Sequence, residues 1–177
     1  MKVLKLLCCY AFAISAQAAN VEVGDAAPDF TLAASDGKSY SLADFKGKQA
    51  VVIAWFPRAF TSGCTVECKS LAEKGHLIRE YDVAYFMASV DPLKDNIGFA
   101  QSLEADFPLL SDPSKEVAEA YGVLRMGLAM RETFYIGMDG TILKIDKDVQ
   151  PTTSAEDIAS TLGELGVAPA NRKPGSQ

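Results

Sequence analysis

The residues most able to do chemistry lie in one short segment, from Trp55 to Cys68. A continuous apolar run ends at Phe56 and a helical pattern begins near Thr61, so Cys64 lies where a strand gives way to a helix. The first N–H groups of a helix lack intrahelical partners, and the helix dipole is positive there. Both effects favour a thiolate over a thiol. We therefore predict that Cys64 is an exposed, reactive nucleophile.

Three further side chains have the properties that such a thiolate needs. Pro57 has a rigid apolar ring and no N–H donor, which suits a wall that excludes water. Thr61 precedes Cys64 by three residues and could offer its hydroxyl to a bound oxygen. Arg131 is a permanently charged fork that would stabilise the thiolate and any charge that develops during a reaction. Arg125 is a weaker candidate for the same role.

Cys68 is the second cysteine of this segment and follows Cys64 by four residues. A disulfide that closes so short a loop removes little entropy from the unfolded chain, so a structural bond explains the pair poorly. In a helix, residues four apart have Cα atoms about 6 Å apart, within the disulfide range but with unfavourable Cβ directions. Cys68 could therefore react with oxidised Cys64 once the first helical turn loosens. Alternatively, it is a small core residue on the apolar face of the helix.

The elements that must position these residues alternate between strands and helices. Apolar runs at 50–56 and 83–90 predict buried strands. Periodic patterns predict helices at 61–81, 91–105, 114–121 and 153–165, with a short strand at 107–110 and hairpins at 29–42 and 132–145. This order predicts one α/β domain, in which a mixed β-sheet has helices on both faces and an N-terminal β-hairpin.

Pro57, Thr61 and Cys64 together form the motif Pro-x-x-x-Thr-x-x-Cys, and Arg131 begins the sequence Arg-Glu-Thr-Phe. These motifs resemble the signature of the peroxiredoxins of the AhpC/TSA superfamily, and the likeness covers nearly the whole chain after residue 18. The Gly-Cys-Thr step at 63–65 is most similar to the bacterioferritin-comigratory, or Q-type, group. The resemblance implies a thioredoxin-like fold and a thiol peroxidase, in which Cys64 attacks the O–O bond of a peroxide and becomes a sulfenic acid.

Two features differ from the pattern of that family. The resolving cysteine of the Q-type group normally lies five residues after the first, whereas Cys68 lies four after Cys64. No cysteine lies near the C-terminus, which excludes the two-subunit disulfide of the typical two-cysteine group. Cys68 is therefore the resolving candidate. The resemblance implies peroxide as substrate, a thioredoxin-like protein or a small thiol as reductant, and no cofactor or metal. We expect a monomer or weak dimer.

Residues 1–18 have the features of a cleavable signal peptide. Lys2 and Lys5 precede an apolar run at 6–14, and Ala16-Gln17-Ala18 has the small residues that a signal peptidase requires. The run is too short for a permanent membrane anchor. We expect an exported protein, periplasmic or secreted, in which 19–168 form the domain and 169–177 a flexible tail. Cys64 and Cys68 would then be its only cysteines.

Charge and motif spacing exclude or disfavour other functions. The formal charge of −6 is unfavourable to nucleic acid, which binds basic surfaces, and no basic amphipathic stretch indicates membrane docking. Copper chaperones of the Sco type share export, this fold and a Cys-x-x-x-Cys pair, and thiolates suit copper(I). They also need a downstream histidine, which is absent after His76. An exported disulfide oxidoreductase is the other alternative, although its cysteines usually have the narrower Cys-x-x-Cys spacing.

Overall fold

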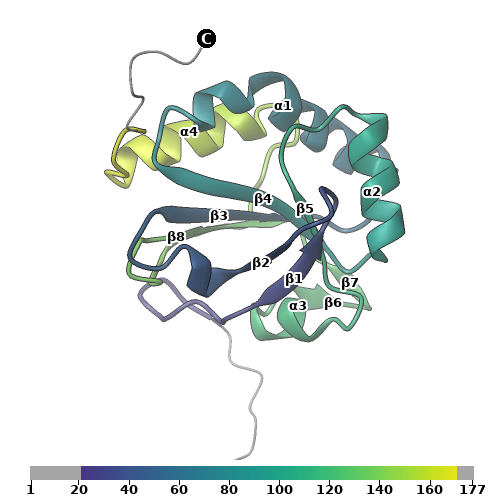
Figure 1. The fold of residues 1–177 in the computed structure, drawn as a ribbon, viewed down its shortest axis with the longest axis horizontal. Coiled ribbons are helices and arrows are strands. Elements are labelled where there is room, and N and C mark those ends of the chain that lie inside the picture. Colours follow the sequence, from purple (N-terminus) through teal and green to yellow (C-terminus); the bar gives the residue numbers. More distant parts are fainter. Residues whose placement is uncertain (1–20, 171–177) are drawn as a thin grey trace, which may run out of the picture.

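Apolar residues fill the two parallel strands at the middle of the sheet. β3 (Ala50–Trp55) is buried along its whole length and pairs in parallel with β4 (Val83–Ser89). Because β3 is covered on both faces, its sequence is apolar throughout and does not alternate. The computed structural model describes residues 21–170, and Figure 1 shows these strands at the centre of the fold.

Seven strands form one mixed sheet in the order β2-β1-β5-β4-β3-β8-β9. On one side of the central pair lie β1 (Thr31–Ala34), β2 (Ser39–Ser41) and β5 (Leu109–Ser111), and on the other lie β8 (Glu132–Ile136) and β9 (Ile142–Asp146). β5 is parallel to β4, whereas the pairs β1–β5, β3–β8 and β8–β9 are antiparallel. The predicted mixed sheet is confirmed, and the predicted N-terminal hairpin is part of it.

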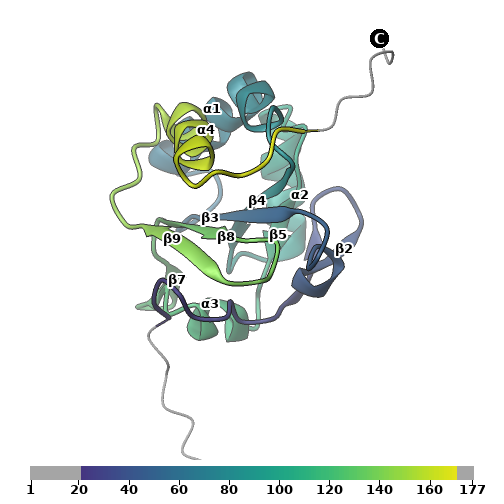
Figure 2. The same ribbon diagram turned by 90° about the vertical axis from the view of Figure 1, so that its left-hand side faces the viewer.

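Helices cover both faces of this sheet (Figure 2). α1 (Ser62–Ile78), α2 (Leu93–Ser102) and α4 (Ser154–Glu164) share one face and one apolar core. The short helix α3 (Glu116–Ala120) lies on the other face with a second core, and the 3-10 turn η1 (Leu42–Asp44) follows β2. The predicted apolar stripe of α1 is buried at each of its positions, which are Cys64, Cys68, Leu71, Gly75 and Ile78.

A small hairpin has no counterpart among the predicted elements. β6 (Leu124–Arg125) and β7 (Leu128–Ala129) pair with each other apart from the main sheet. Strands of two residues are too short to produce an alternating pattern in the sequence. The hairpin closes with a hydrogen bond from the Met130 amide to the Val123 carbonyl, at 2.8 Å. It therefore fixes the chain immediately before Arg131.

The predicted flexible tail at 169–177 is wrong for its first two residues. Pro169 forms a β-bridge with Tyr81, and the Ala170 amide donates to the Glu80 carbonyl at 2.8 Å. A proline is tolerated here because this isolated bridge lies outside the strands of the sheet, so no ladder hydrogen bond from an amide at position 169 is lost. Residues 171–177 of the predicted tail and the predicted signal peptide at 1–18 lie outside the described residues. Between residues 21 and 170, no helix is long and apolar enough to cross a membrane.

Candidate active site

Cys64 lies in the first turn of α1, at the predicted junction between strand and helix. The first helical hydrogen bond runs from the Thr65 amide to the Thr61 carbonyl, at 2.9 Å. The amides of residues 62–64 therefore precede the hydrogen-bonded part of the helix and have no intrahelical acceptor. These amides and the positive end of the helix dipole favour an anion at this position.

Arg131 makes the direct electrostatic contact with this cysteine. Its Nη2 donates to Cys64 Sγ at 3.2 Å, and its Nη1 donates to the Glu67 carboxylate. Gly63 permits this approach, because a Cβ atom at that position would lie only 3.2 Å from Arg131 Nη2. A guanidinium N–H bonds more strongly to a thiolate than to a neutral thiol. The arrangement thus holds a cation against a sulfur at a helix N-terminus.

Glu67 is the site residue that the sequence motifs do not identify. Its side chain is completely buried, it pairs with Arg131, and its Oε1 has no hydrogen-bond partner among the described residues. A buried carboxylate of this kind is stable only beside a cation, so Glu67 and Arg131 fix each other. The available signal is spacing, because residues three apart, such as Cys64 and Glu67, lie on the same face of a helix.

Thr61 and Pro57 lie in the loop between β3 and α1. Thr61 is exposed, and its hydroxyl donates to the Arg58 carbonyl at 2.9 Å. Because this proton is already bonded, the hydroxyl oxygen is available to accept a hydrogen bond from a substrate, rather than to donate one as the sequence suggested. Pro57 is half-buried and follows the buried Phe56 directly.

The prediction that Cys64 is exposed is wrong. The residue is only 1% exposed, because its side chain belongs to the apolar core beneath α1, with Phe56 and Ala59, while Arg131 bonds to its sulfur. The thiol therefore has almost no contact with solvent. Burial also removes water from the sulfur, which strengthens its interaction with the guanidinium.

Cys68 is buried one turn further along α1, and both cysteines are free thiols. Burial, with a smaller effect of the charge of nearby Cys64, raises the pKa of Cys68 to about 12. In the folded helix Cys68 is therefore a neutral thiol at physiological pH, and a poor nucleophile. Both predicted possibilities, core residue and reactive thiol, are compatible with this position.

The other candidates from the sequence lie away from the sulfur. Arg125 lies in β6 and is exposed, and its guanidinium donates to the Leu124 carbonyl at 3.1 Å. Arg131 is thus the arginine that contacts Cys64. His76 is exposed in the last turn of α1. Between residues 21 and 170, no group of three or more His, Cys, Asp or Glu side chains could hold a metal ion.

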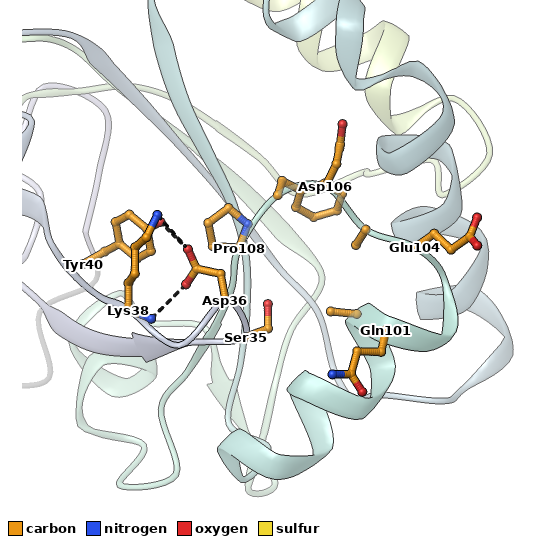
Figure 3. Close-up of a pocket in the computed structure, with 11 residues that line it drawn as sticks. Ser35, Asp36, Lys38, Tyr40, Gln101, Glu104, Asp106 and Pro108 are labelled. Carbon is orange, nitrogen blue, oxygen red and sulfur yellow. Dashed lines mark hydrogen bonds and ion pairs between the residues drawn. The ribbon is translucent and has the colours of Figure 1, made fainter.

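A separate cavity of about 490 Å³ lies between the N-terminal hairpin and the end of α2 (Figure 3). None of the candidate site residues lines it. Among its lining residues, Asp36 accepts a hydrogen bond from the Tyr40 hydroxyl at 2.7 Å and another from the Lys38 backbone amide at 3.1 Å. Burial and this hydrogen bond raise the pKa of Tyr40 to about 12. The cavity is therefore separate from the candidate site, and two of its polar side chains, Asp36 and Tyr40, bond to each other.

Comparisons with known proteins agree with this geometry. Residues 23–145 match the model of the AhpC/TSA family. The putative peroxiredoxin bcp of Haemophilus influenzae is 35% identical over 133 residues, which cover 71% of this chain and 85% of the relative. The crystal structure of peroxidoxin BcpB from Mycobacterium tuberculosis superposes with a TM-score of 0.73 at 30% identity, covering 80% of this chain and 96% of that one.

A more distant structure extends the likeness of the fold. The bacterioferritin comigratory protein of Xanthomonas campestris is 22% identical and has a TM-score of 0.73, covering 81% of this chain and 96% of that one. The predicted thioredoxin-like fold and the predicted family are both confirmed, because the family match spans most of the chain. The chain therefore belongs to the AhpC/TSA family and is a peroxiredoxin, a thiol-dependent peroxidase.

Proposed function

We propose that Cys64 is the peroxidatic cysteine of this enzyme. Its thiolate attacks the terminal oxygen of a peroxide ROOH, the O–O bond breaks, and an S–O bond forms. The products are a cysteine sulfenic acid and the alkoxide RO⁻, which takes up a proton and leaves as ROH. The observation that carries the proposal is the 3.2 Å hydrogen bond from Arg131 Nη2 to Cys64 Sγ at the N-terminus of α1.

The neighbouring residues have distinct proposed roles in this step. Arg131 stabilises the attacking thiolate and the negative charge that develops on the peroxide oxygens. Thr61 accepts a hydrogen bond from the peroxide O–H, since its own proton is bonded to the Arg58 carbonyl. Pro57, which has no N–H to offer, limits the water around the sulfur. These roles are supported by the hydrogen bond of Arg131 to Cys64 and by the places of Pro57 and Thr61 in the loop before α1.

Cys68 is the proposed resolving cysteine. Its thiol attacks the sulfenic sulfur of Cys64, an S–S bond forms, and water leaves. Both sulfurs are buried in one continuous helix, so the bond requires the first turns of α1, Ser62 to Cys68, to unwind. Unwinding separates Glu67 from Arg131 and exposes Cys68, whose pKa then returns toward an ordinary thiol value of about 8.5. The opened segment thus turns a poor nucleophile into a competent one.

The proposed substrates are hydrogen peroxide and organic hydroperoxides. The Xanthomonas campestris protein is described as having alkyl peroxide reduction activity. Next to the site in sequence, Phe60 and Met130 are exposed and could contact an apolar substituent. A thioredoxin-like protein or a small thiol is the proposed reductant, since thiol–disulfide exchange returns both cysteines to the reduced state. Because both cysteines lie in one chain, a monomer or weak dimer suffices.

We propose in addition that the protein is exported to the periplasm or secreted. Support comes from Lys2 and Lys5, the apolar run at 6–14 and the small residues of Ala16-Gln17-Ala18. N-terminal sequencing of the protein from fractionated bacterial cells tests the proposal. A mature chain that begins at Ala19 in the periplasm or medium supports export, and a full-length chain confined to the cytoplasm contradicts it.

The decisive experiment is rapid mixing of the reduced protein with an equimolar amount of hydrogen peroxide. Trp55, the only tryptophan, is buried at the end of β3, the strand that leads into the loop before Cys64, and we expect its fluorescence to report the reaction. We expect a fast change that Cys64→Ser abolishes, followed by an intramolecular 64–68 disulfide found by mass analysis. Cys68→Ser should stop at the sulfenic acid. If Cys64 reacts with hydrogen peroxide no faster than free cysteine does, the proposed peroxidase site is refuted. If mass analysis finds only disulfides between two chains, the proposed role of Cys68 is refuted.

A further inference from the structure

The loop at 57–61, which joins β3 to α1, has a backbone conformation that its own residues do not favour. Phe60 has a φ of 63°, in the left-handed region that a bulky side chain rarely adopts. Phe60 is 61% exposed, so burial of its own side chain offsets little of this backbone strain. Contacts from other parts of the chain must therefore fix the loop. Its position matters because it includes Thr61 and leads directly to Cys64.

Asp91, which follows the end of β4, makes the polar contact. Its Oδ2 accepts a hydrogen bond from the Ala59 amide at 2.9 Å and another from Ser89 Oγ at 3.0 Å. Ala59 is 7% exposed, so loss of this acceptor would leave a buried amide unpaired. The Asp91 amide donates to Ser89 Oγ at 3.2 Å, and the buried Asn96 amide donates to the same oxygen at 3.1 Å. The carboxylate is therefore itself held in place.

Capping of α2 does not account for the Asp91 carboxylate at this position. An aspartate beside a helix start usually caps the helix, but the N-cap of α2 is Pro92, and no side chain caps this end. The hydrogen bonds of Asp91 run instead to the end of β4 and across to the loop. A second, apolar contact comes from α2 itself, where the buried Phe99 meets the Phe60 ring edge to face at 5.2 Å.

We propose that Asp91 is a positioning residue for the peroxide reaction, with Phe99 as its apolar counterpart. By holding the Ala59 amide and the Phe60 ring, they fix the loop so that the Thr61 hydroxyl faces a peroxide at Cys64. The inference rests on the proposed function of Cys64 and Thr61. No hydrogen bond joins Asp91 to the thiol, so its effect is geometric.

Two reactions of Cys64 separate positioning from simple stability. Alkylation by iodoacetamide measures access to the thiol and its ionisation, whereas reaction with hydrogen peroxide also needs an aligned Thr61 hydroxyl. Both rates are measured on the full chain by residue-resolved mass spectrometry. We expect Asp91→Ala to lower the ratio of the peroxide rate to the alkylation rate by about 10-fold or more. Asp91→Asn, whose amide oxygen can still accept from Ala59, should restore most of the ratio.

Asp112→Ala is the matched control. Asp112 follows β5 as Asp91 follows β4, and it accepts a backbone hydrogen bond from the Ala118 amide at 2.8 Å, on the opposite face of the sheet. This variant should lose thermal stability and keep the wild-type ratio. The inference is overturned if Asp91→Ala keeps the wild-type ratio of peroxide rate to alkylation rate. It is also overturned if Asp112→Ala lowers this ratio as much as Asp91→Ala does.

A further variant covers the case in which Asp91→Ala does not fold. Phe99→Leu keeps an apolar residue in the core but removes the ring contact with Phe60. A lowered ratio in this variant supports the inference, and a wild-type ratio overturns it. A wild-type protein whose Cys64 reacts with peroxide no faster than a free thiol refutes the proposed function itself, whatever the Asp91 variants do. The two failures are therefore distinguishable.

Discussion

The two halves of α1 are held by different kinds of contact. The front half, Ser62–Cys68, packs on the core through Cys64 and Cys68, and Arg131 holds it in addition by bonding to both Cys64 and Glu67. Its first amides have no intrahelical acceptors, so this end of the helix has the fewest backbone hydrogen bonds to lose. Helix ends of this kind open at lower free energy than helix centres.

The back half of α1, Lys69–Ile78, is bound to α4 instead. Lys74 pairs with Glu156, and the Ala155 amide donates to Ser70 Oγ at 3.4 Å. We therefore expect unwinding of α1 to stop at the back half. We expect opening of the front half to bring the two cysteines within reach of each other, while the contacts of the back half with α4 keep the fold intact.

Removal of Arg131 should have the largest effect on the front half. We expect Arg131→Ala to slow the reaction of Cys64 with hydrogen peroxide by about 100-fold, as for loss of one preorganised donor in other active sites. It should also lower the free energy of unfolding by about 3 kcal/mol, because Glu67 is left buried without a cation. Stopped-flow fluorescence and urea unfolding measure the two effects.

The double variant Arg131→Ala, Glu67→Gln separates stability from chemistry. Removal of the second charge should recover most of the stability, since no uncompensated ion remains buried. The peroxide rate should stay low, because the cation beside the sulfur is still missing. Recovery of the rate together with the stability would mean that Arg131 acts only by holding the helix, which would contradict its proposed role.

The pH dependence of disulfide formation tests the opening of the front half. Burial, the main cause of the raised pKa of Cys68 at about 12, persists when Cys64 is oxidised. The thiol of the folded state therefore contributes stability that is fully present below about pH 8.5 and is lost as pH rises toward 12. Opening of the helix releases a proton across this window, so opening becomes more favourable as pH increases.

We expect the rate of 64–68 disulfide formation to rise about tenfold per pH unit from pH 7 to pH 10. In a peptide of residues 60–70, Cys68 is always exposed. The rate of 64–68 disulfide formation in this peptide should level off near pH 8.5, the ordinary pKa of a thiol. Acid quenching followed by mass analysis measures both rates. A wild-type rate that levels off together with the peptide would show that Cys68 reacts without leaving a buried environment.

The fold and most of the site could be predicted because they depend on local patterns. The apolar run of β3, the stripe of α1 and the spacing of Pro57, Thr61 and Cys64 are all readable along the chain. Arg131 could be preferred to Arg125 only through the family resemblance, because no local pattern places either arginine beside α1. Glu67 has no motif of its own, and its burial results from the approach of Arg131.

The features that could not be predicted depend on how distant segments meet. The contact between Asp91 and Ala59 joins residues 32 apart, and Asp91 in the sequence suggests only the start of a helix. Burial of Cys64 follows from packing of α1 on the core, whereas its place at the junction between strand and helix suggested exposure. Pairing of Pro169 and Ala170 with 80–81 likewise requires two chain segments to meet at the margin of the sheet.

Loss of the Lys74 charge in the back half should have the smallest effect. Lys74 and Glu156 are both partly exposed, and ion pairs of this kind contribute little to stability because water screens them. We expect Lys74→Met, which keeps helix propensity and an apolar stem, to lower the melting temperature by about 2 °C or less. Rates of peroxide reaction and disulfide formation should be unchanged, because the front half opens without moving this pair. Faster disulfide formation in Lys74→Met would mean that the unwinding extends past Cys68, and the two halves of α1 would then open together.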